Sequence, residues 1–208
     1  MKKLLGHDEL ERVESAFNGE VVVDKSEGEV RFLVGGITQS GRFIDQIWGK
    51  GISYLKNNKF KPRSCLILGL GGGTVAQLVS KTWPGIAIVG VEIDPVMTKL
   101  GKKYLGLSSI SGLRIIIDDA VKFIGRTKER YDLILVDAYR GEAPIDWSLR
   151  TDSVFGALNP GGVAVFNLLF HTDEFRQRAN TFIDGLAGYK VKLLRELTNL
   201  LVVVKGRK

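Results

Sequence analysis

The chain has 208 residues, of which 44% are hydrophobic and 25% charged, and its formal net charge is +7 at pH 7. This length and composition suit one globular domain with a full core and room for a small appendage. The single cysteine, Cys65, excludes a disulfide framework, and no run of about 18 apolar residues is present. We therefore expect a cytoplasmic protein without a membrane span.

The basic residues include one local cluster without an intervening acid, at Lys50, Lys56, Lys59, Lys61 and Arg63. A basic segment can bind a polyanion. No arginine-rich run accompanies this one, which favours a solvated helix end. Nucleic acid is therefore not an expected partner.

The N-terminal segment predicts a helix, a hairpin and a second helix. Asp8–Phe17 has a weak helical spacing of apolar residues. Glu20–Asp24 and Val30–Val34 resemble two short strands, with turn residues around Gly28 between them. Arg42–Asn57 follows as an amphipathic helix.

From Ser64 onward, strands and helices alternate. The expected strands are Ser64–Leu68, Ile86–Glu92, Leu113–Ile117, Tyr131–Asp137 and Gly162–Leu168. The intervening helices are Thr74–Thr82, Val96–Tyr104, Ala120–Gly125 and Arg150–Leu158. Strands this apolar are typical of a parallel sheet that is covered on both faces. A helix, Thr172–Leu186, and two strands joined by a short turn, Tyr189–Leu194 and Leu200–Lys205, complete an α/β fold with an antiparallel C-terminal hairpin.

The strand at 64–68 runs directly into three closely spaced glycines, Gly69, Gly71 and Gly73. Glycines after a buried strand let the backbone approach a bulky ligand, and the N-terminus of the next helix points at that ligand. A dinucleotide site would place a glycine at position 74, where this chain has Thr74, so an NAD site is disfavoured. A tight strand–helix turn without a ligand is the simpler alternative.

Acidic residues follow the next two strands. Glu92 ends the second strand, where a carboxylate can accept hydrogen bonds from both ribose hydroxyls. Asp94 precedes Pro95 and is expected to cap a helix. Of the neighbouring Asp118 and Asp119, one can cap the next helix while the other accepts the exocyclic amine of an adenine, and we favour Asp119 for adenine.

The fourth strand ends in Asp137, which is placed to act as a base or to hold a cationic nucleophile. Tyr139 can stack on a ring, wall the pocket or simply pack. His171 follows the fifth strand and is either a second acid/base or, preferably, part of a helix cap. The two histidines, His7 and His171, are far apart in sequence, and we expect no metal site.

Four segments resemble, in order and spacing, the motifs of spermidine synthases, which share the Rossmann-like fold of class I S-adenosylmethionine-dependent methyltransferases. The segments are Ile67–Gly73, Val91–Asp94, Asp119–Ile124 and Tyr131–Asp137. Upstream, Leu33–Ser40 resembles the family segment in which a glutamine touches the nucleoside. The resemblance implies that Asp137 is the catalytic acid/base. It implies a cofactor site made of Gln39, Gly69, Gly71, Gly73, Glu92 and Asp119.

The resemblance also implies an N-terminal extension at 1–63, an S-adenosylmethionine-binding domain at 64–208 and a possible homodimer. Trp48, Phe60 and Trp147 are candidates for the dimer interface.

The chain departs from the family where the amine pocket should be. Arg140 stands where spermidine synthases carry a second aspartate, and Ser40–Trp48 lacks their acidic and tyrosine pairs. A diamine substrate is a dication, so Arg140 and Arg42 argue against it and favour an acidic or phosphorylated acceptor. Arg140 pairing with Asp137 or Glu142 is an equally good interpretation.

These departures favour methyl transfer from S-adenosylmethionine to an unidentified small-molecule acceptor, which Tyr139 and Arg140 would contact. Aminopropyl transfer from decarboxylated S-adenosylmethionine is the first alternative. A non-catalytic nucleoside-binding module is the second.

Overall fold

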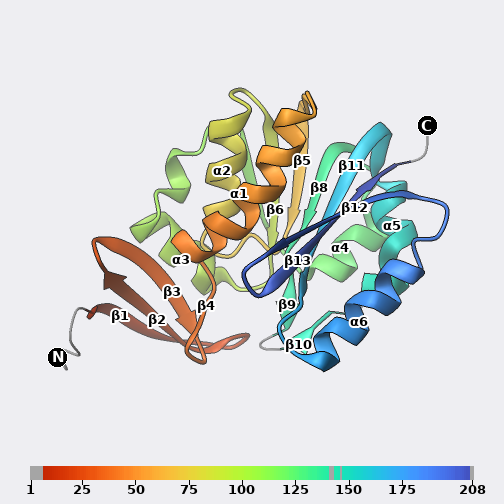
Figure 1. Cartoon of the computed structure of the whole chain (residues 1–208). Helices are drawn as coiled ribbons and strands as arrows, with labels where there is room; N and C mark the ends of the chain where they lie inside the picture. The colour runs from red at the N-terminus through yellow and green to blue at the C-terminus, as the bar shows by residue number, and fades with distance from the viewer. Residues whose placement is uncertain (1–6, 141–142, 146, 207–208) are drawn as a thin grey trace.

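Seven strands form the central sheet, in the order β12-β13-β11-β8-β5-β6-β7 (Figure 1). The computed structural model describes residues 7–140, 143–145 and 147–206. The parallel strands are β5 Ser64–Leu68, β6 Ala87–Glu92, β7 Leu113–Ile117, β8 Tyr131–Val136 and β11 Leu158–Leu169. The hairpin of β12 Lys190–Glu196 and β13 Asn199–Lys205 joins them antiparallel through β13. The predicted mostly parallel sheet with an antiparallel hairpin is confirmed.

Helices cover both faces of this sheet. One face packs against α1 Arg42–Asn57 and α2 Thr74–Thr82, and the other against α4 Ala120–Arg126, α5 Thr151–Gly156 and α6 Asp173–Asp184. Successive side chains of a strand point to opposite faces. Thus Cys65 and Ile67 of β5 pack under α1, while Leu66 and Leu68 pack on the opposite side.

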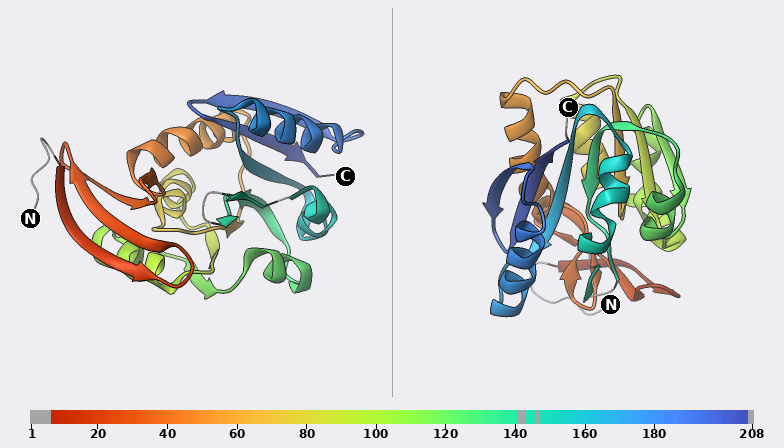
Figure 2. Two further views of the ribbon diagram at one scale, coloured as in Figure 1. Left: turned by 90° about the horizontal axis from the view of Figure 1, so that it is seen from below. Right: turned by 90° about the vertical axis from the view of Figure 1, so that its right-hand side faces the viewer.

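A second, four-stranded sheet lies at the N-terminus, beside α3 Pro95–Tyr104 and below the central sheet in the view of Figure 1. Its strands are β1 His7–Ser15, β2 Gly19–Ser26, β3 Glu29–Val34 and β4 Ile37–Thr38. Figure 2 shows the same arrangement from two further sides. Val21, Val23, Phe32 and Val34 pack against Met97 and Leu100 of α3. This contact holds the small sheet at the carboxyl edge of the large one.

The predicted helix at Asp8–Phe17 is wrong, because these residues form β1 and the turn that follows it. β1 pairs antiparallel with β2 from His7 to Ser15. Leu10 and Phe17, expected on the buried side of a helix, are 41% and 52% exposed. A neighbouring strand that completes backbone hydrogen bonds overrides a weak helical spacing.

Smaller differences lie around the loop after β8. A short ladder joins β9 Tyr139–Arg140 to β10 Ala143–Pro144, and neither strand was predicted. In place of the predicted helix at Arg150–Leu158, the structure has a 3₁₀ turn, Trp147–Arg150, followed by α5. The helix ends before Leu158 because β11 begins there. None of the described helices is long and apolar enough to cross a bilayer.

Candidate active site

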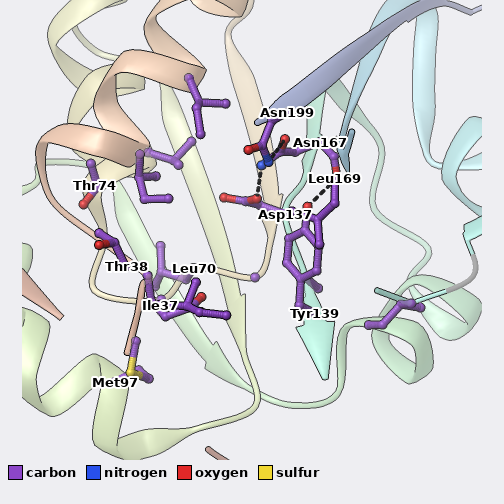
Figure 3. Close-up of a pocket in the computed structure, with 18 of the residues that line it drawn as sticks. Ile37, Thr38, Leu70, Thr74, Met97, Asp137, Tyr139, Asn167, Leu169 and Asn199 are labelled. Carbon is purple, nitrogen blue, oxygen red and sulfur yellow. Dashed lines mark hydrogen bonds between the residues drawn. The ribbon is translucent and has the colours of Figure 1, made fainter. Parts of the chain in front are cut away.

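A cavity of about 530 Å³ opens at the carboxyl edge of the central sheet (Figure 3). Parallel strands deliver their carboxyl ends to one edge, so the loops after β5, β6, β7 and β8 meet there. Seven predicted site residues line the cavity: Gln39, Gly69, Gly71, Glu92, Asp119, Asp137 and Tyr139. Gly73 stands behind the loop, at the N-terminus of α2.

The glycine loop needs its glycines for two separate reasons. Gly69, Gly71 and Gly73 have φ angles of 92°, 53° and 93°, a region that L-residues rarely adopt. At Gly69 there is also no room for a side chain, since a Cβ would lie 2.5 Å from the backbone oxygen of Asp137. Gly69 thus lets the loop after β5 and the end of β8 meet in the cavity.

Glu92 holds the glycine loop in place. Its carboxylate accepts hydrogen bonds from the backbone N–H of Gly71, at 2.7 Å, and of Asp94, at 3.0 Å. Glu92 is only 8% exposed, and this burial raises the pKa of its carboxyl group. Each carboxylate oxygen has two acceptor positions, so Glu92 can also accept from a ligand in the cavity.

Asp94 has the structural role that the sequence predicted. Its side chain accepts from the backbone N–H of Val96 at 2.8 Å and so caps α3. The same carboxylate accepts from Ser15 and from Asn18, the latter at 2.6 Å. Asn18 also lines the cavity. Asp94 therefore ties the N-terminal sheet to the site.

The two neighbouring aspartates after β7 have different surroundings. Asp119 caps α4 by accepting from the backbone N–H of Val121 and Lys122, at 2.8 and 3.1 Å, and it also lines the cavity. Asp118 forms an ion pair with Arg126. Capping and a place in the cavity thus fall to the same residue, whereas we expected them to be divided between the two.

Asp137 has a hydrogen-bond donor on each carboxylate oxygen. Trp48 Nε1 donates to Oδ2 at 2.8 Å, and Asn167 Nδ2 donates to Oδ1 at 2.7 Å. Burial raises the pKa of Asp137 to about 6, against the lowering effect of these two donors, and the charge of Glu92 raises it further. A pKa raised in this way suits a carboxyl group that acts as a general base.

The sequence did not predict three residues of the hydrogen-bond network around Asp137, namely Trp48, Asn167 and Asn199. Figure 3 shows Asn167 and Asn199 beside Asp137, and Tyr139 below them. Tyr139 donates its hydroxyl to the backbone oxygen of Asn167 at 2.8 Å. Trp48, Asn167 and Asn199 carry no charge, so no electrostatic pattern marked them. The available signal was the position of Asn167 at the end of the fifth strand.

Other predictions have mixed outcomes. Trp48 is fully buried and Trp147 is 4% exposed, so these two are wrong as residues of a dimer interface, and a homodimer stays a prediction. The side chain of Arg140 lies outside the described residues, as do Glu142 and Asp146. His171 is exposed at the cavity, where its ring contacts Phe175.

Comparison with known proteins gives a consistent set of matches. The family model described as the spermine/spermidine synthase domain matches residues 51–178. The polyamine aminopropyltransferase of Vibrio vulnificus is 36% identical over 151 residues, which are 69% of this chain and 50% of that protein. The chain therefore spans about half the length of this curated relative.

Two solved structures share the fold. A probable spermidine synthase from Corynebacterium glutamicum superposes with a TM-score of 0.79 and 16% identity, over 94% of this chain and 79% of the other. Human methyltransferase-like protein 13, solved in complex with SAH, has a TM-score of 0.66 and 22% identity, over 80% and 83%.

Proposed function

The chain belongs to the spermine/spermidine synthase domain family, and we propose that it is a transferase that uses S-adenosylmethionine to methylate a small-molecule acceptor. One observation carries the proposal. In the sheet order β8-β5-β6-β7, Glu92 and Asp119 follow the strands on one side of the glycine loop, and Asp137 follows the strand on the other. The cavity thus has a nucleoside half and an acceptor half.

The nucleoside half would hold S-adenosylmethionine through polar contacts to its adenosine. Glu92 would accept from the ribose hydroxyls and Asp119 from the adenine amine. Gln39 would touch the nucleoside, and the backbone of Gly69 and Gly71 would pack against the methionine portion. The human structural neighbour holds SAH, which supports this choice of ligand.

The acceptor half would align a nucleophile with the carbon bonded to the sulfonium and exclude water. Asp137 would take the proton of the nucleophile, while Tyr139 and Arg140 would contact the rest of the acceptor. Bound S-adenosylmethionine supplies the electrophilic methyl group.

Methyl transfer is preferred to aminopropyl transfer because of the charge around Asp137. Diamines are dications and need several carboxylates. Among the described residues that line the cavity, Asp137 is the one carboxylate on the acceptor side. Aminopropyl transfer remains the second candidate, since the Vibrio vulnificus relative is a polyamine aminopropyltransferase.

Calorimetric titration tests the proposal directly. We expect S-adenosylmethionine and SAH to bind, and NAD not to bind. Stronger binding of decarboxylated S-adenosylmethionine and methylthioadenosine than of S-adenosylmethionine would favour aminopropyl transfer. Binding of NAD alone would refute both transfer reactions.

A further inference from the structure

Three adjacent strands place polar residues in one row at the carboxyl edge of the sheet. Asp137 follows β8, Asn167 lies on β11, and Asn199 begins β13. Phe166 is paired with Val136, so Asn167 stands beside Asp137. Asn199 is paired with Leu169, which places it diagonally across from Asn167 on the same face. This face continues the apolar layer that packs beneath α1.

Hydrogen bonds connect the whole row. Thr198 Oγ1 donates to Asn199 Oδ1 at 2.8 Å, and Asn199 Nδ2 donates to Asn167 Oδ1 at 2.9 Å. Asn167 Nδ2 then donates to Asp137 Oδ1 at 2.7 Å (Figure 3). Asn167 and Asn199 are 6% and 4% exposed, so water does not replace these bonds easily.

Every bond in the row donates toward Asp137, and each link determines the next. The carboxylate can only accept, so Asn167 must turn its amide N–H₂ to Asp137 and its oxygen to Asn199. Asn199 must then offer its own N–H₂ to that oxygen. The hydroxyl of Thr198, which can donate, completes the sequence.

The family match covers Asp137 and Asn167 but not the outer part of the row. The family match ends at residue 178, before Thr198 and Asn199. We propose that Asn199, acting through Asn167, is a positioning residue that fixes the orientation of the Asp137 carboxylate and controls when it takes up a proton. The proposal rests on the proposed role of Asp137 as the base.

The effect of Asn199 on Asp137 must be distinguished from the effects of the other groups that lie around Asp137. Glu92, the last residue of β6, raises the pKa of Asp137 through its charge, and Tyr139 on β9 lies beside Asp137. His171, after β11, lines the same cavity. Trp48 donates from α1 on the other carboxylate oxygen.

Trp48 provides a direct reporter of the protonation of Asp137. The chain has three tryptophans, and ¹⁵N-labelled apoprotein should give three indole N–H resonances. The Trp48 resonance should titrate with the pKa of Asp137, at about 6. Trp83 donates to the backbone oxygen of Phe60 and serves as an internal reference.

We expect Asn199→Leu to raise the Trp48 midpoint by about 0.5–1 pH unit, because a weakened donor stabilises the carboxylate less. Asn167→Leu should raise it by about 1 unit or more. If Asn199 acts through Asn167, adding Asn199→Leu to Asn167→Leu should cause no further shift. Asn199→Ala takes the place of Asn199→Leu if the latter does not fold.

Two controls accompany these variants. Asn159→Leu removes a similar bond, from Asn159 to Asp132 at 2.8 Å, at the other end of β8, and should leave the midpoint unchanged. His171→Gln should also leave it unchanged. An unchanged midpoint in folded Asn199→Leu or Asn199→Ala, or an equal shift in both backgrounds, would overturn the proposal. The titration needs no cofactor, so failure of SAH to bind would remove the proposed function without deciding this result.

Discussion

Replacing Asp137 by Asn is expected to change how the free energy of unfolding depends on pH. In the native state burial raises the pKa of Asp137 to about 6 from an ordinary value of 3.8. The native state therefore binds this proton more tightly than the unfolded state does. For a carboxyl group shifted in this direction, stability increases as the pH falls from 8 toward 4.

The size of the effect follows from the two pKa values. Between pH 8 and pH 5, Asp137 should add about 1.4 kcal/mol to the free energy of unfolding of the wild type. Asp137→Asn has no such group, so the difference between the two proteins should change by this amount. For a chain of this length, that corresponds to about 3–6 °C in Tm.

Denaturant unfolding of both proteins at pH 5, 6, 7 and 8, followed by circular dichroism, measures the difference. Titrating groups that do not interact with Asp137 are present in both proteins and cancel in the comparison. Any pH-independent cost of Asn at this position, such as a misdirected amide beside Trp48, displaces the difference curve without changing its slope. A curve that stays flat within about 0.5 kcal/mol would refute the raised pKa and, with it, the match of Asp137 to base catalysis.

Two further predictions concern the nucleoside half of the cavity. Gly69→Ala should cost more than about 2 kcal/mol of stability and weaken SAH binding, because its Cβ would meet the backbone of Asp137 at a φ of 92°. Gly85→Ala, at a φ of 83° with no atom within 4 Å, should cost only about 1 kcal/mol in the same unfolding assay and leave binding unchanged. Asp119→Asn keeps a good helix cap and should change stability by less than about 0.5 kcal/mol, yet weaken SAH about tenfold by calorimetry. Asp118→Asn should leave SAH affinity unchanged, and equal losses in the two aspartate variants would contradict the assignment of adenine to Asp119.

The central sheet could be predicted from the sequence because each of its parallel strands contains a short apolar run that is followed by a turn signal. β5, β7 and α1 begin and end at the predicted residues. The N-terminal strand β1 could not be predicted, because its spacing of Leu10 and Val13 is compatible with a helix. What decides its conformation is β2, a partner that is visible only once the chain is folded.

The charged residues of the site could be predicted from the sequence, and the uncharged residues around Asp137 could not. Glu92, Asp119 and Asp137 are carboxylates at strand ends, a position that itself indicates ligand binding in a parallel sheet. Asn167 and Asn199 contact each other only because β11 and β13 pair in a particular register, which the sequence does not show. A shift of one residue in that register would turn Asn199 to the opposite face.

Trp48 links the N-terminal segment to the chemistry of the site. Ile47, Trp48, Ile52 and Leu55 of α1 are buried against the central sheet, and Trp48 carries the one indole that reaches Asp137 among the described residues. A unit that began at residue 64 would lack α1, so it would expose the apolar face of the sheet that α1 covers and would lose a donor to the proposed base. Because a lost donor raises the pKa of a carboxyl group, such a unit would hold Asp137 protonated to a higher pH. The segment before residue 64 therefore contributes to the electrostatics of the acceptor half as well as to the wall of the nucleoside half.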